Sequence, residues 1–270
     1  MSLFDVVEWL HLAARWIHVF AGIMWVGQTY FFTWLDRRFV EMADQASKRK
    51  EDQNVWMVHS GGFYLVEKQR MPRLMPGTLH WFRWEAAITW LSGITLLILV
   101  YYMGGLMVDD EMDQTLPILA GVATLVFGWL LYDLLWRSTI ARNERLAVAI
   151  SYVAVVGLSY GLTHVMGGRA AYLHIGAMFG TIMTANVWER ILPAQRTMVK
   201  ALTEGKEPDL ALGESAKMRS KHNTFMAVPV VFIMISNHYP VTSYGDNWNW
   251  VILSLLILAG WGAAWKIRRA

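Results

Sequence analysis

The chain has 270 residues, of which 55% are hydrophobic and only 17% charged, and its mean hydropathy is +0.31. This composition excludes an intrinsically disordered chain, because disorder needs low hydrophobicity and high net charge, and the net charge here is only +3. The absence of Cys excludes a disulfide-stapled fold, a thiolate metal site and covalent attachment of a c-type haem.

Seven long stretches of the sequence contain no Asp, Glu, Lys or Arg and are rich in large apolar residues. A bilayer core of ~30 Å is crossed by ~20 apolar residues of helix, so each stretch predicts a transmembrane helix. We therefore expect an all-α integral membrane protein, a single domain over residues 1–270 built as a bundle of seven transmembrane helices. The stretches are Trp16–Leu35, Ala86–Val108, Gln114–Tyr132, Leu146–Gly168, Ala170–Trp188, His222–Gly245 and Asn247–Trp265.

The basic residues between these stretches predict the orientation of the chain. Nearly all of the 24 Lys and Arg fall in alternate connections, and only Arg15 and Arg169 fall on the other side. Because cytoplasmic loops carry the excess of Lys and Arg, we expect the N-terminus outside and the C-terminus in the cytoplasm. The polar segments of about residues 37–80 and 190–221 would be cytoplasmic, the first forming short helices on the membrane surface, and residues 109–113 an acidic outer loop. The basic balance thus indicates topology and not a nucleic-acid partner.

Histidines within the predicted membrane helices are candidate cofactor ligands, because ionisable groups are costly there. His18 and His174 lie at comparable predicted depth, with Arg15 and Arg169 toward the outside. Imidazoles can hold a b-type haem iron, small residues make room for the macrocycle, and Arg can meet its propionates. Glycines near both histidines supply the small residues: Gly22, Gly176 and Gly180.

Other interpretations of these histidines stay open. His11, His164 or His238 could replace His174 as the second ligand of the haem. Each His could instead be a bundle residue that hydrogen-bonds across helices. A copper site is a further alternative, since imidazole and the 16 Met are suitable ligands.

A second polar group is predicted at the cytoplasmic face. It could be an interfacial charge network, a pocket for an anionic substrate, or a second redox site. As a substrate pocket, its acid and base groups His59, His80, Glu85 and His222 would handle protons. Its further predicted members are Lys68, Arg70 and Arg83, with Asp133, Asn186 and Glu189 able to join.

Five segments together resemble the membrane N-terminal domain of the bacterial membrane-anchored urate oxidase (urate hydroxylase) family. They are Arg15–Gly27, His59–Lys68, Leu79–Glu85, Gly168–Asn186 and Ser236–Pro240. The first of them also resembles the first helix of the membrane protoporphyrinogen oxidases, in which its His is linked to haem, and of the copper-resistance D proteins.

The resemblance implies a location in the bacterial inner membrane and a redox protein that acts on urate and passes electrons to a cytochrome c or quinone. It also implies a C-terminal cytochrome c domain, which this sequence does not contain. A role as an accessory subunit of a respiratory or photosynthetic membrane complex is the alternative function, and a copper or small-solute permease is a third.

Overall fold

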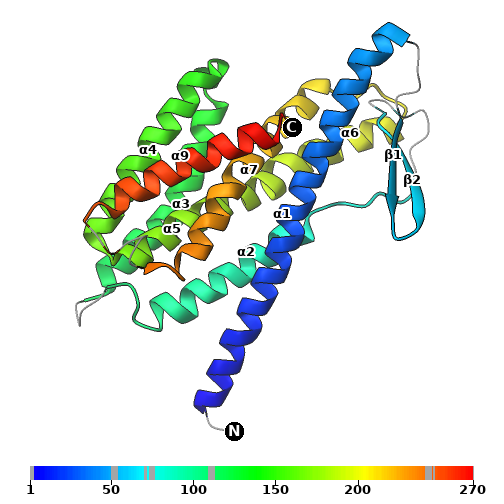
Figure 1. The fold of residues 1–270 in the computed structure, drawn as a ribbon. Helices are drawn as coiled ribbons and strands as arrows, with labels where there is room; N and C mark the ends of the chain where they lie inside the picture. The colour runs from blue at the N-terminus through cyan, green and yellow to red at the C-terminus, as the bar shows by residue number, and fades with distance from the viewer. Residues whose placement is uncertain are drawn as a thin grey trace.

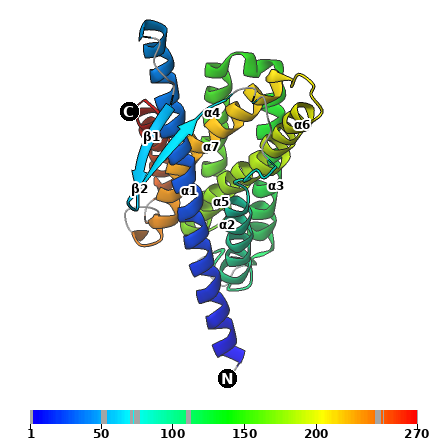
Figure 2. The same ribbon diagram turned by 90° about the vertical axis from the view of Figure 1, so that its right-hand side faces the viewer.

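The computed structural model describes residues 3–49, 54–69, 72, 77–108, 113–240, 245 and 247–269, and it is a helical bundle with one small hairpin at its side (Figures 1 and 2). Its helices are α1 (Leu3–Arg49), α2 (Trp84–Leu96), α3 (Thr115–Arg137), α4 (Glu144–Val165), α5 (Gly168–Ala185), α6 (Leu192–Thr203), α7 (Leu210–Ser236) and α9 (Asn249–Ile267). Two π-helical segments, η1 (Leu97–Tyr102) and η3 (Asn186–Ile191), extend α2 and α5, and a short turn of 3-10 helix, η2 (Thr139–Arg142), joins α3 to α4.

Within the described residues, five helical segments are long and apolar enough to cross a membrane. They are Val6–Ala43, Trp84–Tyr102, Thr115–Arg137, Glu144–Val165 and Asn249–Ile267. The other two predicted stretches fall mainly on α5 and α7, which are helical but lie inside the bundle against their neighbours. The mainly helical, membrane-type fold is therefore confirmed, while seven crossings and their orientation stay predictions.

Helix α5 is the centre of the bundle and packs against α2, α3, α4 and α7. Most of its side chains are buried, among them Tyr172, Ile175 and Phe179. Helices α7 and α9 approach each other closely at Gly260, which has no side chain. A Cβ placed on Gly260 of α9 would lie 3.0 Å from Cδ of Pro229 in α7. The bundle thus buries polar side chains on α5 and α7, whereas apolar side chains are exposed on its outer helices.

The predicted surface helices between residues 37 and 79 are wrong for this segment. Helix α1 continues without a break to Arg49, and an antiparallel hairpin of β1 (Asn54–His59) and β2 (Gly62–Glu67) follows. Ser60 and Gly61 form its turn at positive φ, 49° and 76°, which is the conformation that two-residue hairpin turns favour. Lys68 pairs with Asp36 and ties the hairpin to α1. The predicted Arg70 and the acidic residues 109–111 lie outside the described residues.

The bundle has a basic end and an opposite end. The basic end carries α6, the hairpin and the C-terminus of α9, and the N-terminus of α1 lies at the opposite end (Figure 1). The connection from α3 to α4 and the start of α7 also lie at the basic end, which is the predicted cytoplasmic end.

Candidate functional site

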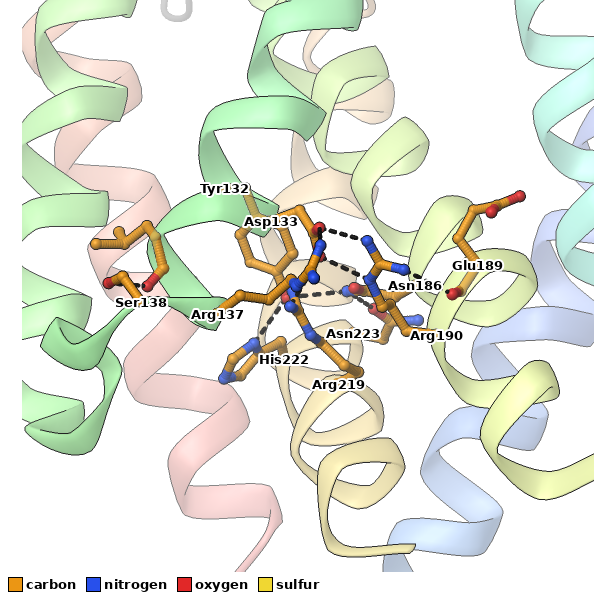
Figure 3. Close-up of polar contacts among 11 residues, drawn as sticks. Tyr132, Asp133, Arg137, Ser138, Asn186, Glu189, Arg190, Arg219, His222 and Asn223 are labelled. Atoms are coloured by element: carbon orange, nitrogen blue, oxygen red, sulfur yellow. Dashed lines mark hydrogen bonds and ion pairs between the residues drawn. The ribbon is translucent and has the colours of Figure 1, made fainter. Parts of the chain in front are cut away.

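A polar network joins α3, α7 and the η3 segment at the basic end (Figure 3). Its centre is Asp133, whose carboxylate is only 8% exposed. Arg190 donates to both of its oxygens, from Nε at 2.9 Å and from Nη2 at 2.5 Å, and Arg219 Nη2 donates to Oδ1 at 2.8 Å. Arg137, one turn along α3, lies 3.6 Å from Oδ2. One carboxylate therefore faces three guanidinium groups.

The three guanidinium groups of this network differ in burial. The side chain of Arg219 is 2% exposed, that of Arg190 is 32% exposed and that of Arg137 is 64% exposed. The hydrogen bond to the Asp133 carboxylate raises the pKa of Arg190, so this group stays charged. Three guanidinium groups face the Asp133 carboxylate, and the exposed Glu189 adds a second negative charge that acts on Arg190, so the network keeps an excess of positive charge.

A neutral hydrogen-bond chain runs beside the ion pairs. Asn223 Nδ2 donates to the backbone oxygen of Met183 at 2.9 Å, and Asn186 Nδ2 donates to Asn223 Oδ1 at 2.9 Å. Asn186 Nδ2 also donates to the Tyr132 hydroxyl at 3.0 Å, which lies 2.7 Å from His222 Nδ1. The Arg219 guanidinium lies 5.0 Å from the centre of the Tyr132 ring, so Tyr132 connects the hydrogen-bond chain to the ion pairs.

Three buried polar atoms of this cluster have no hydrogen-bond partner among the described residues. They are Arg219 Nη1, Asn186 Oδ1 and His222 Nε2. Buried polar groups are nearly always paired, because an unpaired one costs roughly 1–3 kcal/mol. Their gathering in one network indicates a place where water or a ligand completes the hydrogen bonds.

An apolar cavity of about 1190 Å³, open on its outer side where Phe127 and Leu131 are exposed, adjoins the network. It lies among α3, α4, α5, α7 and α9, and its wall includes Tyr132 and His222 from the network. Glu144 and Lys221, which also line it, pair with each other. Most of the remaining lining is apolar or aromatic, for example Phe127, Leu158, Met178, Phe225 and Leu258. The site thus has a charged side that reaches solvent through Arg137 and Arg190, and an apolar side.

The four residues predicted to handle protons do not come together in this arrangement. His59 ends β1 at the exposed tip of the hairpin, where its Nδ1 lies 2.7 Å from Ser60 Oγ. His80 is exposed before α2 and packs edge-on against Phe82, with ring centres 4.5 Å apart. Glu85 accepts a hydrogen bond from Gln28 Nε2 at 3.0 Å. Only His222 belongs to the network.

His18 and His174, the predicted haem ligands, lie in different helix interfaces. The Nδ1 atom of His18 donates to the backbone oxygen of Thr89 at 2.9 Å, and the ring packs against Gly93 of α2. A bond of this kind fixes the tautomer and the orientation of an imidazole and leaves Nε2 as the nitrogen that could bind a metal.

His174, by contrast, is fully buried with both ring nitrogens engaged. Its Nδ1 lies 2.7 Å from the backbone oxygen of Ala170, and its Nε2 lies 3.1 Å from the Tyr102 hydroxyl. A Cβ on Gly121 would lie 2.5 Å from that Nε2. Ligation of iron by His174 therefore requires Tyr102 to release Nε2 and α3 to give way.

The remaining predicted haem residues lie toward the end of the bundle opposite the basic end. Arg169 is exposed and donates from Nε to Asn237 Oδ1 at 2.7 Å, next to the exposed His238. Arg15 is exposed on α1, and His11 is half-buried one turn before it. Of the predicted small residues, Gly22 faces Thr89, whose Cγ2 would lie 3.8 Å from a Cβ placed on Gly22, and Gly176 packs on Ile233. The glycines that contact the two imidazoles are Gly93 and Gly121.

The described part of the chain contains no cluster of metal-binding side chains that would support the alternative of a metal transporter. No group of three or more His, Asp or Glu residues gathers there in a way that could hold a metal ion.

Comparison with known families decides the relationship of the chain. A family model described as urate oxidase N-terminal matches residues 5–266. The chain belongs to the urate oxidase N-terminal family. No curated protein matches the chain, and no solved structure matches it. In this member of the urate oxidase N-terminal family the match spans every helix of the bundle, the polar network and the cavity.

The sequence places Asp133, Asn186 and His222 of this urate oxidase N-terminal chain in the predicted cytoplasmic polar group, but it does not single out Arg190 and Arg219. These two arginines fall within a predicted cytoplasmic polar segment, because each lies just outside a charge-free stretch. A signal was nevertheless present: Asp133 is a lone acid at the end of an apolar stretch, and a buried acid needs a cation.

Proposed function

We propose that this chain is the membrane part of a urate-oxidising redox protein of a bacterial inner membrane, and that the polar network at the basic end holds the anionic substrate. Membership of the urate oxidase N-terminal family supports the substrate class. The observation that carries the site is the excess positive charge around Asp133, together with the unpartnered Nη1 of the buried Arg219.

The chemistry of urate matches this arrangement. Urate is a planar monoanion at neutral pH and carries carbonyl oxygens that accept hydrogen bonds. Guanidinium groups recognise such flat anions with paired N–H donors. Arg137 and Arg190 face solvent and meet the anion first, and Arg219 Nη1 offers a further donor from inside the bundle. The Asp133 carboxylate keeps the guanidinium groups in place.

The reaction is a two-electron oxidation with balanced atoms. Urate and one water molecule give a singly hydroxylated urate, two protons and two electrons. The electrons pass to a cytochrome c or a quinone. A b-type haem, if bound, would supply one-electron transfer, and His18 would hold its iron through Nε2 while Thr89 orients the ring.

The test is equilibrium binding of urate to the purified protein in lipid nanodiscs. Losing one charge-assisted hydrogen bond costs roughly 1.5–3 kcal/mol, so Arg190→Gln should weaken urate binding by about tenfold or more. Arg196→Gln, an exposed change on α6 without an ion pair among the described contacts, is the matched control and should bind as the parent does.

Two results would overturn the proposal: no saturable urate binding by the parent protein, or equal binding by Arg190→Gln. A chain that binds no urate and co-purifies in fixed ratio with a respiratory or photosynthetic complex would instead be an accessory subunit.

A further inference from the structure

The hydrogen-bond chain beside the ion pairs fixes which nitrogen of His222 carries the proton. The Met183 backbone oxygen only accepts, so the Asn223 amide must present its nitrogen there and its oxygen to Asn186. Asn186 then uses both hydrogens of Nδ2, one toward Asn223 and one toward the Tyr132 hydroxyl. This assignment also explains why Asn186 Oδ1 is the atom left without a partner.

The assignment continues from Tyr132 to His222. The Tyr132 hydroxyl accepts from Asn186, and among its described contacts His222 Nδ1, at 2.7 Å, is the one acceptor available to the hydroxyl hydrogen, so Tyr132 donates to it. Nδ1 is therefore an acceptor, and a neutral imidazole with an acceptor at Nδ1 carries its proton on Nε2. His222 lines the cavity, and its Nε2 has no partner among the described residues. The polar end of the cavity thus holds an unsatisfied N–H donor.

A second unsatisfied donor lines the same cavity. Trp261 of α9 is part of the wall, and its Nε1, which can only donate, is buried without a partner in the described structure. The hydroxyls of Thr124 and Ser151 are different, since each donates to a carbonyl of its own helix. These two donors therefore favour a ligand that carries hydrogen-bond acceptors.

The charges around the cavity favour a neutral ligand. Its two charged lining residues, Glu144 and Lys221, form an ion pair with each other and leave no net charge. A phospholipid phosphate would find no free cation there, whereas carbonyl oxygens would find the two N–H donors. The volume of about 1190 Å³ exceeds the roughly 300–1,000 Å³ of common small-molecule pockets, which suits a ring with a long apolar tail.

We propose that this cavity binds a membrane quinone, with a ring carbonyl accepting from His222 Nε2–H and the isoprenoid tail lying along the apolar wall. Trp136, whose ring centre is 4.0 Å from that of His222, and Tyr132 form aromatic walls at the ring end. The cavity and the arginine network meet at Tyr132 and His222, so the quinone ring would lie next to the anion site.

The role of the bound quinone rests on the proposed function. A quinone takes up two electrons and two protons to become a quinol, which equals what the hydroxylation of one urate by water releases. Urate, water and quinone then give hydroxylated urate and quinol, with all atoms and electrons accounted for. Binding of the quinone itself does not depend on urate.

The experiment measures equilibrium binding of a radiolabelled decyl-quinone to the protein in quinone-free nanodiscs. Ala154→Phe fills the cavity from α4 without touching the network, and it should abolish saturable binding. Ala149→Phe places the same ring on the exposed face of α4, outside the cavity lining, and should bind as the parent does. Trp261→Phe keeps the shape but removes one donor, worth roughly 0.5–1.5 kcal/mol, and should weaken binding about two- to tenfold.

Competition separates the possible occupants. Displacement of the label by unlabelled decyl-quinone and not by diacylglycerol supports the proposal. Quinone binding that survives Ala154→Phe overturns it, as does a phospholipid retained by the parent protein and lost from that variant. Quinone binding without urate binding would refute only the proposed function, and urate binding without quinone binding would refute only this inference.

Discussion

Arg219 Nη2 and Asp133 Oδ1 lie 2.8 Å apart in the interior of the bundle, where the two side chains are 2% and 8% exposed. A buried cation is tolerated only when it is paired and hydrogen-bonded, so this contact holds α3 and α7 in register at the basic end. It also shows why the exposed arginines of the same network are not equivalent to Arg219.

Asp133→Asn should destabilise the protein strongly. The change leaves Arg219 buried without a counter-charge, and breaking a buried pair costs roughly 3–5 kcal/mol. Arg137→Gln removes a partner of the same carboxylate, but one that is 64% exposed and 3.6 Å away, so its cost should be about 1 kcal/mol or less. Thermal unfolding in detergent measures both. Similar losses of stability for the two variants would contradict the assigned burial.

Gly121→Ala should destabilise the contact between α3 and α5. The new Cβ would lie 2.5 Å from His174 Nε2 and 3.2 Å from the Tyr102 hydroxyl oxygen, which forces a shift in a packed interior and costs roughly 1–3 kcal/mol. Gly180→Ala on α5 meets no atom within 4 Å and should be neutral or slightly stabilising, because Ala is the better helix former. Unfolding midpoints of the pair distinguish a steric effect from a general intolerance of the bundle.

The haem prediction is tested by the reduced-minus-oxidised visible spectrum. We expect a b-type signal in the parent protein that is lost in His18→Ala, since the hydrogen bond to Thr89 engages Nδ1 and leaves Nε2 as the nitrogen that can bind iron. His80→Ala, at an exposed position where the imidazole packs edge-on against Phe82, is the control and should keep the signal. A folded parent protein without any haem signal would exclude the cofactor, and a signal retained in His18→Ala would exclude this ligand.

The orientation of the chain can be tested without background labelling because the sequence has no Cys. Lys206→Cys lies in the exposed connection between α6 and α7, and Asp113→Cys lies just before α3. With the N-terminus outside, a membrane-impermeant maleimide should label residue 113 in intact cells and residue 206 only after permeabilisation. The opposite pattern would reverse the predicted topology.

Sequence patterns predict the helices well and the site poorly, for a physical reason. Charge-free stretches report the length needed to cross a bilayer, so they locate α2, α3, α4 and α9 closely. The same criterion does not detect the network, because Arg190 and Arg219 lie at the ends of charge-free stretches, where a charged residue is ordinary. Only the folded structure, in which Arg190 of η3 and Arg219 of α7 extend to α3, reveals that both reach Asp133.

The hairpin and the histidine pair show a second limit. Val55 and Val58, flanking Trp56, favour a strand, and Ser60-Gly61 favours a tight turn, but these local signals are weaker than the polarity that predicted a surface segment. His18 and His174 share a predicted depth, yet depth along a helix does not say which neighbour a side chain faces. The two imidazole rings pack against Gly93 and Gly121 and not against the predicted glycines.

The hydrogen-bond chain that begins at the Met183 carbonyl cannot be reversed, because a backbone oxygen has no hydrogen to give. A relay that shuttles protons must invert every donor and acceptor along its length after each passage. Asn186 Nδ2 donates in both directions, to Asn223 Oδ1 and to the Tyr132 hydroxyl, so the chain has no single direction and cannot carry a proton from one end to the other. Under the proposed function, protons released at the arginine network would therefore leave through solvent, and protons taken up in the cavity would arrive by another route.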